Sequence, residues 1–183
     1  GGGGCMNAVA KAFVEARPKE LRGVSIGVLP GVPGGGDWAA RREGEAAAGG
    51  SGGLKPQAPR GYPNDYVELA IRTHLPSSGT RGEDPSSRNH INVLSSDAVI
   101  ALPGGPGTAS EVRLALAYGR PVCLFLAEGD DSIAEIGRGE ELLKEYGDGQ
   151  LTVATDIDAV GAWLEKTLPS PAGAEAQAPQ RPV

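Results

Sequence analysis

The sequence predicts an α/β fold of the Rossmann type, with a parallel sheet between two layers of helices. Short apolar runs bounded by Gly and Pro alternate with segments in which apolar residues recur at helical spacing, an order typical of strands joined by crossover helices. The apolar runs lack a polar face, as expected of strands that are covered on both sides. Ligands of such sheets bind beyond the carboxyl ends of the strands, so we expect a functional site there.

The first predicted elements are a helix over 6–16, a strand over 24–29 and a strand over 66–76. The helix has its apolar residues on one stripe, and the first strand is a short β-branched run closed by Gly and Pro. The segment 66–76 fits the alternation of a strand and also the spacing of a helical face. Its length and the terminal Pro76 favour the strand.

A loop is predicted over 78–85, followed by a helix over 87–96 that opens with Pro and Ser, residues that favour helix starts. The apolar run 98–103 is predicted to be a buried strand. A helix follows from 108, and Gly119 is expected to end it as the left-handed C′ residue.

The chain continues with a buried strand over 121–127 and a helical pattern over 130–147 that two glycines interrupt. A short strand over 151–154 and an amphipathic helix over 156–168 complete the predicted order. The last helix has an Asp near its start, where the side chain can cap the first turn.

These elements predict a single Rossmann-like domain over 1–168. Within it, the segment 34–63 is low in complexity and rich in Gly, Ala and charged residues, which predicts a disordered insertion. The Pro- and Ala-rich segment 169–183 is predicted to be a disordered tail.

The composition argues against several classes of partner. The 183 residues carry a net charge of -6, whereas a nucleic-acid partner would require a basic face. No apolar run approaches the ~20 residues of a membrane span, so no membrane partner is expected. Cys5 and Cys123 have neither metal-ligand nor redox spacing. We therefore expect no metal site and a reducing, cytoplasmic location.

The sequence "PGGPGT" at 103–108 joins a predicted strand to a predicted helix. A helix that begins near Thr108 presents N–H groups without helical partners at its positive end. Gly104, Gly105 and Gly107 let the backbone approach an anion closely, and the Thr108 hydroxyl adds a donor. No Gly-Lys-Ser/Thr ending follows, so a nucleoside triphosphate loop is disfavoured. The turn predicts a phosphate site; the alternative is a tight strand-to-helix turn that Thr108 caps.

Three polar residues near this turn each have more than one interpretation. Glu111 follows Thr108 by three positions, so it either completes a capping box or reaches a ribose hydroxyl or a proton of a ligand. Arg88 either offers a planar fork of donors to a phosphate or is an exposed helix residue. Asn89 either caps, bridges water or contacts the ligand.

The segments "SRNHINVLSSDAVIALPGGPGTASEV" and "GGGGCMNAV" together resemble the Lonely Guy and lysine-decarboxylase-like superfamily of Rossmann proteins. Within that superfamily, the sequence is most similar to the molybdenum cofactor carrier proteins. The resemblance implies that the glycine turn holds a phosphate and that a second glycine run contributes. The ligand-binding residues expected on this basis are Gly2, Gly3, Gly4, Arg88, Asn89, Gly104, Gly105, Gly107 and Thr108.

The resemblance implies two alternative functions. The first is carriage of a phosphorylated small molecule, with molybdenum cofactor, a pterin phosphate, as the expected ligand. The second is a phosphoribohydrolase that releases ribose 5-phosphate from a nucleoside 5′-monophosphate, with Arg88 and Glu111 as catalytic residues and no required cofactor. Lonely Guy enzymes usually carry a further glutamate where this sequence has Ser110, which favours the carrier.

Two further expectations follow from the resemblance. Members of the superfamily self-associate, so a homo-oligomer, either a dimer or a tetramer, is expected. They also begin with a strand–helix–strand unit before the first glycine turn, and this sequence is expected to lack that unit.

Overall fold

A computed structural model describes residues 2–18, 20, 23–31, 60–127, 129, 133–147 and 149–168 of the chain. They belong to two compact units, Gly1–Asn92 and Val93–Val183. The single domain expected over 1–168 stays a prediction. The insertion expected over 34–63 lies outside the described residues except for its last four positions, and the tail expected over 169–183 lies outside them entirely.

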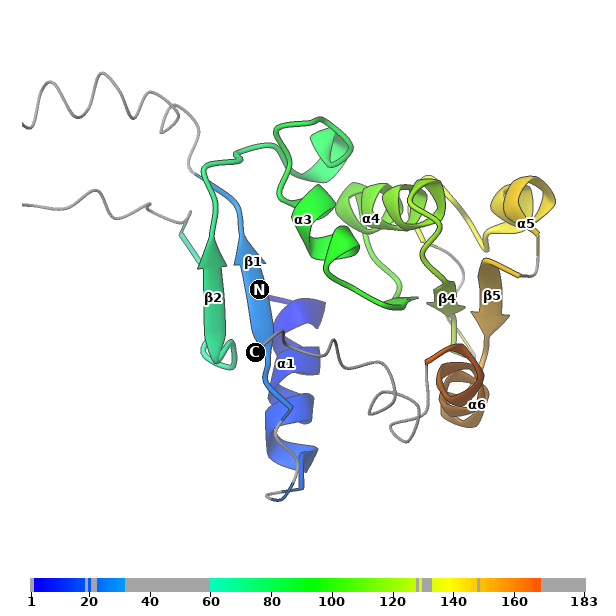
Figure 1. The fold of residues 1–183 in the computed structure, drawn as a ribbon, viewed down its shortest axis with the longest axis horizontal. Coiled ribbons are helices and arrows are strands. Elements are labelled where there is room, and N and C mark those ends of the chain that lie inside the picture. Colours follow the sequence, from blue (N-terminus) through cyan, green and yellow to red (C-terminus); the bar gives the residue numbers. More distant parts are fainter. Residues whose placement is uncertain are drawn as a thin grey trace, which may run out of the picture. The chain divides into compact units, whose positions relative to one another are not determined.

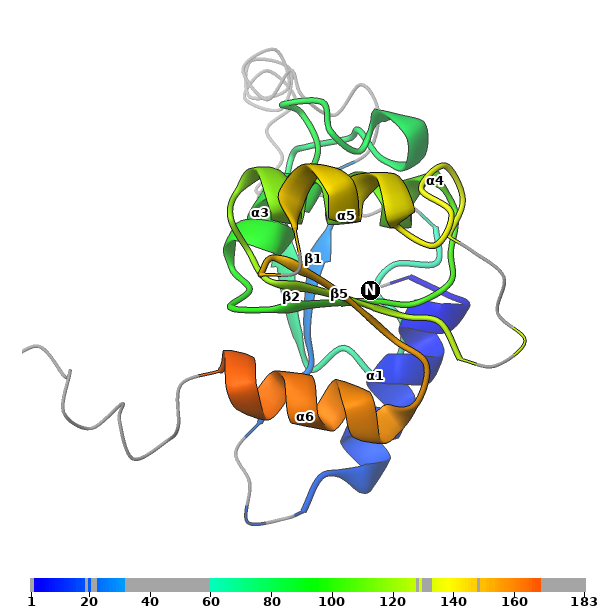
Figure 2. The same ribbon diagram turned by 90° about the vertical axis from the view of Figure 1, so that its right-hand side faces the viewer.

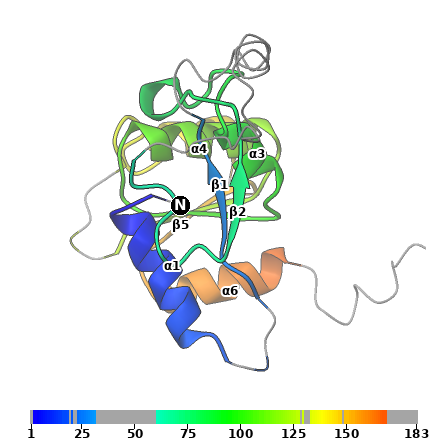
Figure 3. The same ribbon diagram turned by 90° about the vertical axis from the view of Figure 1, so that its left-hand side faces the viewer.

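The first unit contains a helix of three turns and a pair of parallel strands. Ile26 lies opposite Leu69 at the start of the pair, and β1 and β2 run side by side in Figure 1 and Figure 3. This pairing confirms the strand predicted within 66–76. The elements are α1 (Cys5–Ala16), β1 (Ile26–Leu29), β2 (Leu69–Arg72), the 3₁₀ helix η1 (Gly79–Arg81) and the start of α3 (Asn89–Leu94).

Two predictions for this unit are wrong in detail. The segment 78–85 is not a loop throughout, because η1 forms a 3₁₀ turn within it. The helix expected over 87–96 is shorter, since α3 has six residues. Ser87 is held outside the helix because its main-chain N–H donates to the carbonyl oxygen of Asp84 at 2.8 Å and because it forms a parallel bridge with Ser77.

The second unit is a three-stranded parallel sheet with helices on both faces. The strand order is β3-β4-β5, and Figure 2 shows α4 and α5 on one face of this sheet and α6 on the other. The three layers confirm the predicted fold class, but the described strands of the chain form two separate sheets rather than one. The elements are β3 (Val99–Ala101), α4 (Pro106–Ala117), β4 (Val122–Phe125), α5 (Glu140–Tyr146), β5 (Leu151–Ala154) and α6 (Ile157–Thr167).

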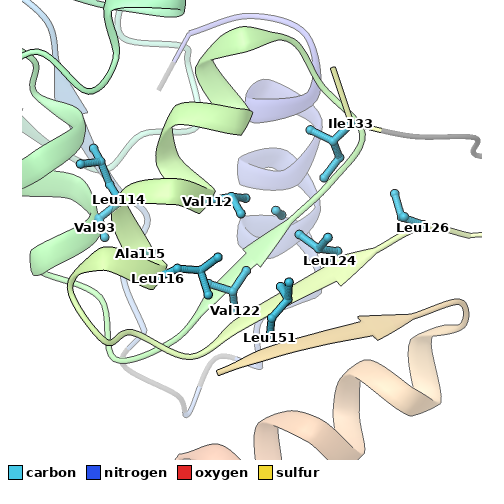
Figure 4. Packing of buried hydrophobic residues seen from close by; sticks show 11 residues of the cluster. Val93, Val112, Leu114, Ala115, Leu116, Val122, Leu124, Leu126, Ile133 and Leu151 are labelled. Atoms are coloured by element: carbon cyan, nitrogen blue, oxygen red, sulfur yellow. The ribbon is translucent and has the colours of Figure 1, made fainter. Parts of the chain in front are cut away.

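Alternate side chains of β4 supply the cores on the two sides of the sheet. Val122 and Leu124 are fully buried with Val112 of α4 in the larger core, which Figure 4 shows between the helix and the strands. Cys123 points to the opposite side and packs with Val160 of α6. Burial raises the pKa of the Cys123 thiol, so this cysteine stays protonated and serves in packing.

The helix expected over 130–147 is wrong in its first half. From Ile133 the described chain forms a turn in which Ile133 pairs with Gly137, and α5 begins only at Glu140. Gly139 precedes it in the left-handed conformation at φ 81°. A Cβ at Gly139 would lie 2.6 Å from the Cδ1 atom of Leu124, so a side chain there would also displace the buried Leu124 side chain.

Candidate anion-binding turn

The glycine turn begins where β3 ends and leads directly into α4. Gly105 is the N-cap residue, with an extended backbone at φ -90° and ψ -163°, and Pro106 lies at the start of the first turn. Proline fits there because the N–H groups of the first turn have no helical acceptor. The N–H groups of Thr108 and Ala109 both donate to the Gly105 carbonyl oxygen, at 3.0 and 3.3 Å.

The helix start expected near Thr108 is therefore wrong. α4 begins at Pro106, and no side-chain hydrogen bond caps it. The alternative in which Thr108 caps the helix and Glu111 completes a capping box is wrong as well. The fixed φ of Pro106 already suits the helix, so the helical conformation starts at that residue.

The turn presents donors that the described part of the chain does not use. Among the described residues, no protein group accepts a hydrogen bond from the main-chain N–H of Gly105 or Gly107. Gly105 is exposed and Gly107 is half-buried, so a solute can reach both. The positive end of a twelve-residue helix lies behind them. An acidic chain can attract an anion here because the attraction is local and dipolar.

Gly104 is in contact with two other segments. A Cβ at this position would lie 2.2 Å from the Oγ1 atom of Thr108, so the threonine hydroxyl lies directly beside the glycine. On the other side, the main-chain N–H of Ala134 donates to the Gly104 carbonyl oxygen at 3.0 Å. Ala134 is not among the predicted site residues, because a main-chain bond between segments far apart in the chain leaves no pattern of residue types.

The next residues of α4 differ in their surroundings. Ser110 is 2 % exposed, and its hydroxyl donates to the Pro106 carbonyl oxygen at 2.9 Å. Glu111 is half-buried. One turn further, the Nη1 atom of Arg113 lies 3.2 Å from the Oε2 atom of Glu135. At positions 110 and 111 Lonely Guy enzymes usually carry two glutamates. This helix carries only one carboxylate there, Glu111.

The predicted glycines of the first unit lie at the start of α1. Gly4 is the N-cap residue, with φ 62° and ψ -136°, a conformation that favours glycine. Gly2 is buried, its carbonyl oxygen accepts a hydrogen bond from Asn64 Nδ2 at 3.0 Å, and a Cβ there would lie 2.8 Å from the Tyr62 ring. Gly3 is exposed with open space around it. Packing against Tyr62 thus accounts for Gly2, and the backbone conformation at φ 62° accounts for Gly4.

Arg88 and Asn89, also in the first unit, lie where the Asp84 turn enters α3. They are 8 % and 2 % exposed, so the alternative of an exposed helix arginine is wrong. The Asn89 N–H donates to Ser87 Oγ at 3.2 Å. The Asn89 Oδ1 atom is buried and accepts no hydrogen bond from the described residues. A buried amide oxygen without a donor is costly, which favours Asn89 as a ligand contact.

A model of the SLOG cluster4 family matches residues 1–152 of the chain. The chain belongs to the SLOG cluster4 family. The match includes the glycine turn and the segment before it, and it confirms the resemblance that these residues predicted. A comparison with curated proteins yields no match.

Two solved structures resemble this SLOG cluster4 protein. The molybdenum cofactor carrier protein of Chlamydomonas reinhardtii is 27 % identical, with a TM-score of 0.54, and the match covers 91 % of this chain and 74 % of that one. The molybdenum cofactor binding protein of the phototrophic bacterium Rippkaea orientalis is 25 % identical, with a TM-score of 0.52, and the match covers 88 % and 69 %. Both support the Rossmann-like fold.

Other kinds of site are not found in the part of the SLOG cluster4 protein that the structure describes. There, His, Cys, Asp and Glu side chains form no cluster of three or more that could hold a metal ion. No described helix has the length and hydrophobicity needed to cross a membrane. The two cysteines are both free thiols, Cys5 exposed and Cys123 buried.

Proposed function

We propose that this SLOG cluster4 protein binds molybdenum cofactor through the phosphate of its pterin and acts as a carrier. The observation that carries the proposal is the exposed turn at the start of α4, where the N–H groups of Gly105 and Gly107 have no acceptor among the described residues. The Thr108 hydroxyl adds a third donor beside Gly104. Donors of this kind at a helix N-terminus stabilise a phosphate.

The choice of ligand rests on the two solved relatives, whose names describe proteins that carry or bind molybdenum cofactor. A carrier requires a site that binds an anion and no hydrolytic group. Here that site is the anion seat, the turn in which the N–H groups of Gly105 and Gly107 have no acceptor among the described residues. α4 supplies the single carboxylate of Glu111 next to the buried Ser110. Hydrolysis of a glycosidic bond has to stabilise a cationic sugar in the transition state and uses paired carboxylates in many hydrolases, so a single one favours retention of an intact ligand.

The proposal includes the residues of the first unit that the resemblance implies. Arg88 supplies a guanidinium and Asn89 a buried amide oxygen. The proposal also includes a cytoplasmic location and a homo-oligomer. The free thiols of Cys5 and Cys123 are consistent with a reducing compartment.

The test of the proposal is retention of the cofactor by the purified chain. Molybdenum cofactor released from a molybdoenzyme is mixed with the protein without oxygen and passed through a gel-filtration column. Pterin and molybdenum are then quantified in the protein peak. We expect saturable retention, with one cofactor per chain, and the elution volume reports the oligomeric state. Elution of all cofactor at its own small-molecule position contradicts the proposal.

A pair of substitutions at Gly105 locates the binding site. Gly105→Asp places a carboxylate at the N-cap, where Asp is favoured, so the helix remains stable while the anion seat is filled by a negative charge. A Cβ at Gly105 meets nothing within 4 Å, so the fold is undisturbed. We expect retention to fall roughly tenfold or more in Gly105→Asp and to stay close to the wild-type level in the neutral Gly105→Ala. Equal retention by both variants would place the ligand away from this turn.

A further inference from the structure

The orientation of the glycine turn depends on the peptide group between Gly104 and Gly105. This peptide is trans, since Tyr62–Pro63 is the cis peptide of the described chain. In a planar trans peptide the C=O and the N–H point in opposite directions. The Gly104 carbonyl oxygen accepts its hydrogen bond from Ala134. The Gly105 N–H, a donor of the anion seat, therefore points away from Ala134.

Neither residue of this peptide can hold it in place with a side chain. Glycine populates several backbone regions about equally, so a Gly-Gly peptide can rotate by changes in the two adjacent dihedral angles. Rotation would exchange the directions of the N–H and the C=O and would present an oxygen to an incoming anion. The hydrogen bond from Ala134 opposes that rotation.

The turn that carries Ala134 is itself anchored at two points. Ile133 is 1 % exposed in the larger core. It exchanges two hydrogen bonds of 2.9 Å with Gly137, one in each direction, which closes the turn. The second anchor is the ion pair between Glu135 and Arg113 of α4. Ile133 and Glu135 thus hold Ala134 from both sides.

Glu135 has a backbone conformation that residues other than glutamate usually occupy in turns. Its φ is 70°, and it is the non-glycine residue of the described chain with a positive φ. Asn, Asp and Gly adopt this conformation at lower cost. The side chain of glutamate reaches Arg113 at 3.2 Å, whereas a glycine has no side chain to do so. The strained position is therefore occupied by a residue that ties the turn to α4.

We propose that Arg113 and Glu135 are positioning residues that keep the Gly105 N–H directed toward a bound phosphomonoester. They act through Ala134 and the Gly104 carbonyl oxygen, and they need not contact the ligand. This inference rests on the proposed function, because it concerns the same anion seat. Loss of the ion pair removes one of the two anchors of the 133–137 turn, which weakens the Ala134 hydrogen bond and lets the Gly104–Gly105 peptide rotate more readily.

A purely structural role for the pair makes a different prediction. The two side chains are 35 % and 41 % exposed, and an ion pair as exposed as this one contributes little to the free energy of unfolding. A structural pair would change stability slightly and leave anion affinity untouched. A positioning pair changes anion affinity and the exchange of the Ala134 amide at nearly constant stability.

The experiment uses the full chain labelled with ¹⁵N and inorganic phosphate as the probe. Phosphate is titrated into the wild type, Glu135→Gln, Arg113→Gln and Glu135→Gly, while the Gly105 amide resonance, the hydrogen exchange of the Ala134 amide and the melting temperature are measured. Glu141→Gln is the matched control, since Glu141 forms an exposed ion pair with Lys144 at 3.5 Å on α5.

We expect phosphate to shift the Gly105 resonance in the wild type and the control. In the three test variants we expect roughly fivefold weaker phosphate binding and faster exchange at Ala134, with melting temperatures close to the control. Wild-type affinity in these variants overturns the inference and leaves the proposed function intact. A wild type whose Gly105 resonance does not respond to phosphate overturns both.

Discussion

Thr108 lies so close to Gly104 that a side chain at position 104 would displace it. A Cβ there would be 2.2 Å from Thr108 Oγ1 and 3.1 Å from Thr108 Cβ. Rotation of the hydroxyl relieves the first contact but not the second, because the Cβ of Thr108 is fixed to the backbone of α4. Gly104 is not among the described glycines with positive φ, so the close approach alone accounts for the glycine.

We predict that Gly104→Ala destabilises the protein by about 1–3 kcal/mol, the usual cost of an overpacked site. The substitution also pushes the Thr108 hydroxyl away from the anion seat, so cofactor retention falls with stability. Urea denaturation followed by circular dichroism measures the free energy of unfolding, and gel filtration with the cofactor measures retention.

Gly105→Ala is the matched control for this prediction. A Cβ at Gly105 meets nothing within 4 Å, and its φ of -90° is open to any residue. We expect its free energy of unfolding to stay within about 0.5 kcal/mol of the wild type. A loss in Gly105→Ala as large as in Gly104→Ala would contradict the steric explanation.

Asp156 is predicted to stabilise the last helix as its N-cap. Its Oδ1 atom accepts a hydrogen bond from the main-chain N–H of Ala159 at 2.8 Å. Asp156→Ala removes the acceptor and should lower the free energy of unfolding by about 1 kcal/mol, whereas Asp156→Ser keeps an acceptor and should cost less. Denaturant titration of the three proteins checks the order. Equal stability of the Ala and Ser variants would exclude a capping role.

The sequence predicted those features that are set by neighbouring residues. Gly119 was expected to end a helix, and it follows α4 with φ 67°, because a left-handed C′ residue favours glycine in any fold. The Asp expected near the start of the last helix is the N-cap residue Asp156. Parallel strands over 24–29 and 121–127 were likewise identified by their apolar runs, and both segments form strands.

Features set by distant segments were not predictable in this way. The bond from Ala134 to Gly104 joins main-chain atoms, and neither residue type indicates it. The start of α4 at Pro106 was missed because Thr108 and Glu111 also fit a capping box by spacing. The burial of Arg88 was missed for a similar reason, since an arginine in a helix is usually exposed and only the turn at Asp84 and Ser87 shows otherwise.

Asp84 is predicted to make stability depend on pH in the acid range. Its pKa is lowered from 3.8 to about 2, first by the hydroxyl of Ser86 and then by the Ser86 main-chain N–H and Arg81. These groups stabilise the carboxylate, so the folded state binds the proton less tightly than the unfolded state. The contribution is present above pH 3.8 and is lost as pH falls toward 2. An NMR titration of the Asp84 carboxyl carbon measures the pKa directly.

Asp84→Asn tests the sign of this dependence. The amide is neutral at every pH, so the wild type should be more stable than the variant near pH 6, and the difference should shrink as pH falls from 4 to 2. Denaturant titrations at several pH values give the two curves. A difference between the two proteins that grows in acid would show that folding destabilises the Asp84 carboxylate, whereas its contacts with Ser86 and Arg81 are expected to stabilise it.

The residue at position 110 distinguishes a carrier from a phosphoribohydrolase. The Ser110 side chain is 2 % exposed and its hydroxyl donates to the Pro106 carbonyl oxygen, so a carboxylate at this position would be buried beside that carbonyl oxygen, which repels it. Ser110→Glu should therefore be destabilised by several kcal/mol relative to Ser110→Ala. Neither the wild type nor the Glu variant should release ribose 5-phosphate from AMP. A stable Ser110→Glu protein that does release it would show that this position faces the ligand, and Glu111→Gln would then abolish the activity.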